Sequence, residues 1–206
     1  MFNLLKTLFH ESGHFFAMEC HNKKDNRFDS KNIKIYELSN YKYNGDYNPN
    51  ISPEIVSDSI LVCEIASKTQ ISAAIVPLER LSYFLLRMIN GCVFESIFCK
   101  NSYDVCFNEN SNGKDDFRAF MFQTEYHNIK AATILQKINN YKFELEESNI
   151  LKKLFTVSLE ETCKVNKFNH KQYDIDLDYL RKHFDIDLYY KIYQKAIKEL
   201  EDIILS

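Results

Sequence analysis

The alternation of apolar and polar positions divides the chain into long helical segments and one short region typical of strands. Residues 2–20 are apolar on most sides, which predicts a buried helix. Residues 33–38 alternate between apolar and polar side chains, as a half-buried strand does. The Asn44-Gly45 dipeptide is typical of a tight turn. We therefore expect a small β-sheet or hairpin between the first and second helices.

Helical patterns dominate the rest of the chain. A serine and a proline at positions 52 and 53 are a typical helix start, and a helix is predicted from there to about residue 68. The further predicted helices cover residues 78–98, a segment from about Asp115 to Leu135, and about 145–165, 176–183 and 187–204. The predicted fold is mainly α (α+β). Residues 141–206 are expected to form a helical C-terminal extension packed on the domain of residues 1–140.

Composition and charge exclude several classes of function. Lysine and arginine number 26 against 29 aspartates and glutamates, so the net charge of −3 gives no basic patch for nucleic acid. No uninterrupted apolar stretch reaches the length of a membrane span, and the apolar start of the chain lacks the features of a signal peptide. Six cysteines without a Cys-x-x-Cys pair predict buried, reduced thiols. We therefore expect a cytoplasmic protein.

One short motif in the first predicted helix carries recognisable chemistry. His10, Glu11 and His14 form a His-Glu-x-x-His pattern. On a helix the two histidines lie one turn apart on the same face, so both imidazoles can bind one metal ion. The glutamate lies beside that face, where it can exchange a proton with an attacking water. The pattern predicts a Zn²⁺ site with Glu11 as the general base; the alternative is two core histidines hydrogen-bonded to backbone or carboxylate groups.

A catalytic zinc site of this kind needs a third protein ligand from elsewhere in the chain. His21 would lie roughly 10 Å further along the helix axis than His14, too far to share the ion. A downstream carboxylate is therefore expected, and the candidates are Glu95, Asp115 and Asp116. Each has an ordinary alternative role. The two aspartates are also typical helix caps, and Glu95 is also typical of an exposed residue or of a partner that orients a ligand histidine.

Four glycine-containing segments follow one another in a characteristic order. They lie at residues 10–14, 33–47, 90–95 and 112–117, and they contain all four glycines of the chain. In order and spacing they resemble the peptidase domain of the FtsH-type zinc proteases, over roughly residues 5–140. The resemblance implies that Asp116 is the third zinc ligand, with Glu95 and Asp115 as alternative ligands or as partners that orient a ligand. It also implies that the strand near Gly45 binds an extended substrate.

The resemblance implies a peptidase without the ATPase module and membrane spans of that family. The chain contains no Gly-x-x-x-x-Gly-Lys-Ser/Thr loop for ATP. We therefore expect a zinc metalloendopeptidase that cuts flexible or unfolded polypeptide without ATP, and a homo-oligomer or a partner protein is compatible with this function. One alternative is a catalytically inactive, protease-derived zinc-binding interaction module, which would not need Glu11. Another is a regulatory peptidase that cuts a single partner protein.

Overall fold

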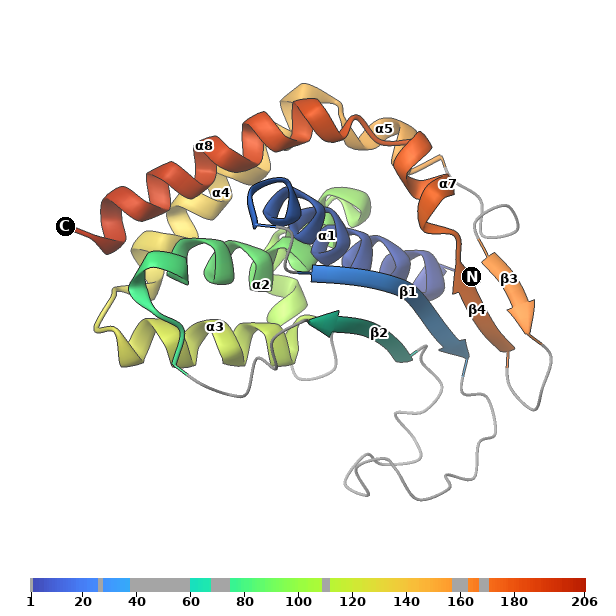
Figure 1. Ribbon diagram of the computed structural model, residues 1–206, viewed down its shortest axis with the longest axis horizontal. Helices are drawn as coiled ribbons and strands as arrows, with labels where there is room; N and C mark the ends of the chain where they lie inside the picture. Colours follow the sequence, from blue (N-terminus) through green and yellow to red (C-terminus); the bar gives the residue numbers. More distant parts are fainter. Residues whose placement is uncertain are drawn as a thin grey trace, which may run out of the picture.

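Helices form most of the described part of the protein, as the sequence predicts. The computed structural model describes residues 2–25, 28–37, 60–67, 75–108, 112–156, 163–166 and 171–206. The helices in these ranges are α1 (Phe2–Asp25), α2 (Leu78–Cys99), the 3₁₀ helix η2 (Tyr103–Phe107), α3 (Lys114–Tyr126), α4 (Ala131–Ser148), α5 (Leu151–Leu154), α7 (Leu177–Lys182) and α8 (Ile186–Ile204) (Figure 1). The mainly α class is therefore confirmed.

Four strands form one antiparallel sheet beside the helices. They are β1 (Phe28–Glu37), β2 (Ile60–Ser67), β3 (Cys163–Asn166) and β4 (Lys171–Ile175), in the order β2-β1-β4-β3. In the central strand β1, Ile33 pairs with Cys63 of β2 on one side and with Ile175 of β4 on the other. Strands β3 and β4 come from the C-terminal part of the chain. The sheet is therefore not limited to the region between α1 and α2, as the sequence had predicted.

Two predicted helices are wrong, because a short apolar run does not distinguish a helix from a buried strand. The described end of the helix predicted after positions 52 and 53 is strand β2, which pairs with β1. The helix predicted over residues 145–165 breaks at Asn149, which adopts a left-handed conformation with φ of 56°. Cys163–Asn166, within the same predicted helix, is strand β3. A left-handed residue at Asn128 likewise separates α3 from α4, where the sequence predicted one helix.

The central contact of the fold is the crossing of α1 and α2, where the two backbones touch. A Cβ atom on Gly13 of α1 would lie 2.5 Å from the Asn90 carbonyl oxygen of α2. A Cβ atom on Gly91 of α2 would lie 2.5 Å from Nε2 of His14 and 2.8 Å from Nε2 of His10. Neither position has room for a side chain. Because both are glycine, α2 lies directly against the histidine face of α1.

Three buried polar side chains tie the crossing to the C-terminal helices. The side-chain amide of Asn90 donates to the Gly13 carbonyl oxygen and, at 2.8 Å, to the Tyr189 hydroxyl of α8. The Tyr141 hydroxyl of α4 donates to Oδ1 of Asn90 at 2.8 Å and lies 3.0 Å from the Tyr189 hydroxyl. With one proton on each hydroxyl, every donor finds an acceptor if Tyr189 donates to Tyr141. Burial raises the pKa of both tyrosines, so both hydroxyls keep their protons.

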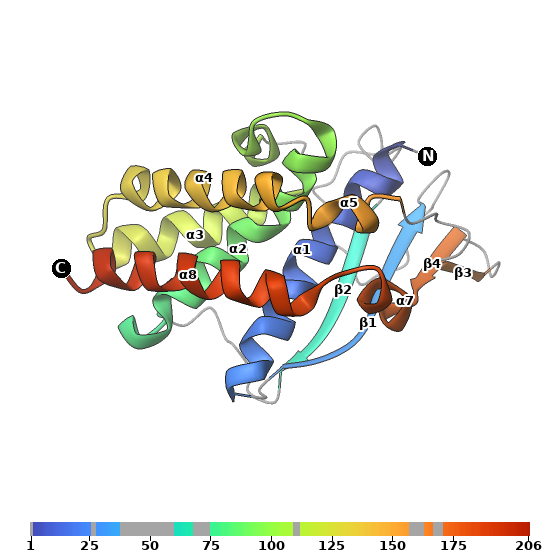
Figure 2. The ribbon, with the colours of Figure 1, turned by 90° about the horizontal axis from the view of Figure 1, so that it is seen from above.

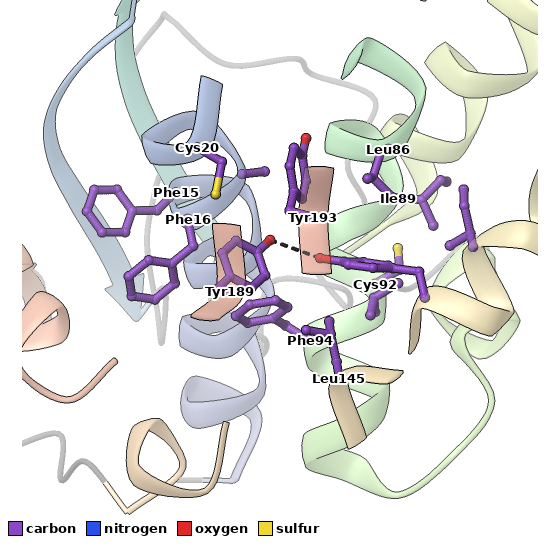
Figure 3. Packing of buried hydrophobic residues seen from close by; sticks show 14 of the residues in the cluster. Phe15, Phe16, Cys20, Leu86, Ile89, Cys92, Phe94, Leu145, Tyr189 and Tyr193 are labelled. Atoms are coloured by element: carbon purple, nitrogen blue, oxygen red, sulfur yellow. Dashed lines mark hydrogen bonds between the residues drawn. The ribbon is translucent and has the colours of Figure 1, made fainter. Parts of the chain in front are cut away.

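The C-terminal segment shares its core with the N-terminal helices. Phe16 of α1 stacks on Phe184 with ring centroids 3.8 Å apart. Phe94 of α2 lies edge-on to Tyr189 of α8, with ring centroids 5.8 Å apart (Figure 3). The predicted boundary at residue 140 falls inside the continuous helix α4. The described residues after this position therefore contribute to the same core as α1 and α2.

Helix α2 lies inside the fold rather than on its surface. Figure 2 shows the helices α3, α4 and α8 toward one side of the α1–α2 crossing and the sheet toward the other. Among the described helices, α2 is long and apolar enough to cross a membrane by length and composition alone. However, 72% of its apolar window is buried within the protein. This burial is that of a core helix, which is apolar because its neighbours cover it.

Replacing Gly13 with alanine should destabilise the protein. At an open helical position this change stabilises by about 1 kcal/mol, because alanine favours the helix. Here the new methyl group meets the backbone of α2, and we expect a loss of about 1–3 kcal/mol in the free energy of unfolding. Urea denaturation measures this difference. Thr133→Ala, an exposed change on α4, is the control and should shift stability by less than about 0.5 kcal/mol. A stability of Gly13→Ala equal to or above wild type would contradict the proposed backbone contact.

Candidate metal centre

Three side chains from α1 and α3 meet at one point beside the helix crossing. Nε2 of His10 and Nε2 of His14 each lie 3.1 Å from Oδ2 of Asp116. The two Nε2 atoms lie 3.3 Å apart. The histidines are one turn apart on α1, and Asp116 lies in the first turn of α3. The Asp116 side chain is 23% exposed, so the group is not sealed from solvent.

Hydrogen bonds on the far sides of the two imidazole rings fix the positions of their protons. Nδ1 of His14 lies 2.8 Å from the backbone carbonyl oxygen of Arg87, which can only accept. Nδ1 of His10 lies 3.1 Å from Oε2 of Glu95, a carboxylate that also accepts. Each Nδ1 therefore carries a proton, and in the neutral ring Nε2 keeps its lone pair. Two nitrogen lone pairs and one carboxylate oxygen then point at a common centre.

This arrangement requires positive charge at its centre, and its dimensions suit a metal ion. Three acceptor atoms 3.1–3.3 Å apart repel one another unless a cation or added protons lie between them. Tetrahedral zinc, with Zn–N bonds of about 2.0–2.1 Å, holds its ligand atoms about 3.3 Å apart. Two imidazoles and one carboxylate are also a ligand set that zinc accepts. His10, His14 and Asp116 thus form a group that fits a metal ion.

The electrostatics of the group favour a bound cation. Burial opposes protonation of His10, but hydrogen bonds to Asp116 and Glu95 outweigh it and raise the pKa of His10 to about 10. Burial also opposes ionisation of Asp116, but the positive charge of His14 and the hydrogen bonds to both histidines hold the pKa of that carboxyl below its usual range. Without a metal the group therefore takes up protons. A metal ion that replaces them releases protons on binding.

Glu11 lies next to this group in a different environment. Its side chain is half-buried. Burial raises the pKa of its carboxyl, against the opposing positive charges of His14 and His10. A carboxylate with a raised pKa holds a proton more readily than an ordinary glutamate, which is a property that a general base needs. The charges of both histidines therefore act on the Glu11 carboxyl.

The two adjacent aspartates of α3 are separated by the phase of the helix. Consecutive helical residues point about 100° apart, so both cannot face the histidines. Asp116 lies in the group, whereas the side chain of Asp115 is 90% exposed. Oδ1 of Asp115 lies 3.3 Å from Nη1 of Arg118 on the surface of α3. Asp115 therefore does not contribute to the group of converging donors.

Glu95 is a buried partner of His10. Its two carboxylate oxygens accept from four donors, each at 3.1 Å: Nδ1 of His10 and Nδ2 of Asn112 on Oε2, and Nζ of Lys6 and Sγ of Cys106 on Oε1. Burial opposes ionisation of Glu95, but the hydrogen bond and charge of His10 outweigh it and lower the pKa of the carboxyl. The ionised carboxylate fixes the ring orientation and tautomer of His10. Outer partners of ligand histidines in zinc sites have this role.

Three of the four glycines allow close packing around the group. Gly91 leaves room for both imidazole rings. Gly113, in the turn before α3, packs against Sγ of Cys92, and a Cβ atom there would also lie 2.8 Å from the carbonyl oxygen of Cys106. From the sequence alone, only the family resemblance connected these glycines with one another. Gly45, the predicted substrate-binding residue, lies outside the described residues.

Sequence reasoning missed the side chains that surround Glu95. Lys6, Cys106 and Asn112 come from α1, from η2 and from the turn before α3, and no local motif joins them. Lys6 did carry a signal, because it lies four residues before His10 and so on the same helix face. Cys106 is buried and forms no disulfide, in agreement with the predicted reduced thiols. The carbonyl oxygen of Arg87 had no signal, because a backbone acceptor has no residue preference.

Comparisons with known proteins do not assign the chain to a family. No family model, no curated protein and no solved structure matches it. The resemblance to the FtsH-type peptidase domain therefore stays a prediction from four sequence segments. Function is inferred from the geometry and electrostatics of the metal centre.

We expect the purified protein to bind about one zinc ion per chain. His14→Ala and Asp116→Ala should each lose it, because each removes one of the three donor atoms that converge in the described part of the chain. Asp115→Ala should retain the metal, because its side chain faces solvent. Elemental analysis after dialysis measures the content of each variant. Equal metal in the Asp115 and Asp116 variants would contradict the assignment of the third ligand.

Glu95→Gln should weaken zinc binding without removing the site. Glutamine presents one oxygen and one amide nitrogen, so two of the four donors around this position would face another donor. We expect affinity to fall by about 10–100-fold, as for other partners of ligand histidines. Competition with a chromogenic chelator measures the change. Wild-type affinity in this variant would show that Glu95 does not orient His10.

Proposed function

We propose that the protein is a zinc-dependent metallopeptidase that hydrolyses peptide bonds in flexible or unfolded polypeptide. The convergence of two imidazole nitrogens and one carboxylate oxygen beside Glu11 is the observation that supports this proposal most strongly. A purely structural zinc site has four protein ligands, whereas a catalytic site has three and leaves one position open. Among the residues that the structure describes, the group of His10, His14 and Asp116 offers three.

Zinc is the proposed metal because of the ligand types and their separation. Neutral imidazoles suit zinc better than they suit calcium or magnesium, which prefer oxygen ligands. The triangle of 3.1–3.3 Å matches tetrahedral coordination. Nδ1 of each histidine donates to a fixed acceptor, so both Nε2 atoms are already oriented as ligands.

Each residue of the site would have its own role in hydrolysis. His10, His14 and Asp116 would hold the zinc ion, which when bound supplies a Lewis acid that polarises the scissile carbonyl and activates water. Glu11 would accept a proton from the attacking water and pass it to the leaving amine. Glu95 keeps Nδ1 of His10 protonated, so that Nε2 of that ring remains a donor to the metal.

The proposed substrate follows from what the chain contains. The 206 residues contain no phosphate-binding loop, and four glycines leave little room for one, so the proposed reaction of these residues does not use ATP. A peptidase without such a motor cuts segments that are already extended. We place this activity in the cytoplasm, on polypeptide rather than on nucleic acid.

Glu11→Gln should abolish peptidase activity while the metal stays bound. Glutamine keeps the shape of the side chain but cannot take up a proton, and loss of a general base lowers turnover by about 10²–10⁴-fold. Hydrolysis of an unfolded, fluorescently labelled casein measures the activity, with zinc content measured on the same samples. Asp115→Ala is the matched control and should keep both. Peptidase activity that survives in Glu11→Gln would contradict the proposed role of Glu11. A wild-type protein that binds zinc but cuts no unfolded substrate would favour the inactive interaction module.

A further inference from the structure

Asn112 and His10 share one acceptor. Nδ2 of Asn112 and Nδ1 of His10 both lie 3.1 Å from Oε2 of Glu95. Asn112 is four residues before Asp116, at the start of the turn that leads into α3. The carboxylate oxygen that orients the first ligand is therefore also bonded to the segment that carries the third.

The turn from Asn112 is short and closely packed, so its position determines that of Asp116. Gly113 contacts Sγ of Cys92 and lies close to the carbonyl oxygen of Cys106, so the turn is held between α2 and η2. Helix α3 begins at the next residue, and its first turn is closed by Phe117 N–H donating to the Gly113 carbonyl oxygen at 2.9 Å. Asp116 lies inside that first turn. A shift of the Asn112 end would therefore move the Asp116 carboxylate with it.

Among the residues that the structure describes, no side chain caps the N-terminus of α3. Gly113 occupies the cap position and has no side-chain oxygen to offer the first helical N–H groups. The polar contacts of Asn112 instead lead away from α3: its Nδ2 bonds Glu95 of α2 and lies 3.4 Å from Oγ1 of Thr7 on α1. The Asn112 amide thus joins the start of α3 to the two crossing helices.

We infer that Asn112 is a positioning residue that sets the third metal ligand, Asp116, against the first, His10, through the carboxylate of Glu95. This inference rests on the proposed metal site. The Asn112 amide donates a hydrogen bond to Oε2 of Glu95 and is not itself a metal ligand. By fixing the start of α3, Asn112 sets the distances from Oδ2 of Asp116 to the two Nε2 atoms. Tetrahedral coordination depends on these distances.

The substitution Asn112→Asp distinguishes this role from a local one. Aspartate has almost the same shape as asparagine and is favoured in turns and near helix N-termini, so a residue that only forms the turn would tolerate the change. Against Glu95, however, the new carboxylate replaces a donor with a second negative charge. The positioning role therefore predicts damage at the metal site, whereas the local role predicts none.

The test is binding of zinc and cobalt(II) to the full chain as wild type, Asn112→Asp, Asn112→Ala and the control Asn139→Ala, an exposed asparagine of α4. We expect zinc affinity, from chelator competition, to fall about 10–100-fold in both Asn112 variants and to stay unchanged in the control. The visible absorption of bound cobalt(II), which reports ligand geometry, should change in the Asn112 variants. The metal-free melting temperature of Asn112→Ala should fall only slightly, because three other donors to Glu95 remain, whereas that of Asn112→Asp should fall further because the two carboxylates repel.

Each outcome has one meaning. Wild-type zinc affinity and an unchanged cobalt(II) spectrum in Asn112→Asp would overturn the positioning role while leaving the metal site intact. The same result in Asn112→Ala would overturn it if the aspartate variant does not fold. A wild-type protein that binds neither metal would instead remove the proposed metal site, and the inference with it.

Discussion

The close approach of α1 and α2 at Gly13 and Gly91 is the contact on which the rest of the structure depends. Helices that pack through larger side chains lie about 8–10 Å apart, which would carry the partners on α2 away from the histidines. At the glycine contact, the Arg87 carbonyl oxygen and the Glu95 carboxylate lie one turn on either side of Gly91 and reach the two imidazole rings. The contact that builds the core therefore also orients the candidate metal ligands.

Hydrogen bonds from the C-terminal helices stabilise this contact. Asn90, next to Gly91, is fully buried, and a buried amide costs free energy unless its donors and acceptor are satisfied. Its partners are the Gly13 carbonyl oxygen and the hydroxyls of Tyr141 and Tyr189. Because the two tyrosines come from α4 and α8, the segment that the sequence predicted only to pack on the rest of the domain also completes the polar contacts of the crossing.

The sequence predicts the α1 half of the site well, because that half depends on local periodicity. Residues four apart on a helix share a face, so the spacing of His10 and His14 determines their relation whatever the rest of the chain does. The third ligand depends on the phase of a different helix. From the residues alone Asp115 and Asp116 were equivalent candidates, and only the start of α3 at Lys114 separates them.

The sheet and the shell around Glu95 were beyond local reasoning. The apolar pattern of Ile60–Ser67 is compatible with a helix or a strand. Its pairing with β1 in the folded protein makes it a strand. Strand β4 pairs with β1 from more than a hundred residues away, and β3 joins the sheet through β4, so no local pattern encodes this arrangement. The four donors on Glu95 likewise come from three parts of the chain, namely α1, η2 and the turn before α3, and they meet only in the folded protein.

Anomalous diffraction at the zinc absorption edge, from crystals grown with zinc, tests the central claim most directly. The account predicts one strong peak about 2.0–2.2 Å from Nε2 of His10, Nε2 of His14 and a carboxylate oxygen of Asp116, with Glu95 and Asp115 outside bonding distance. A peak bound by Glu95, Asp115 or cysteine sulfur, or no peak at this position in crystals that contain zinc, would contradict it.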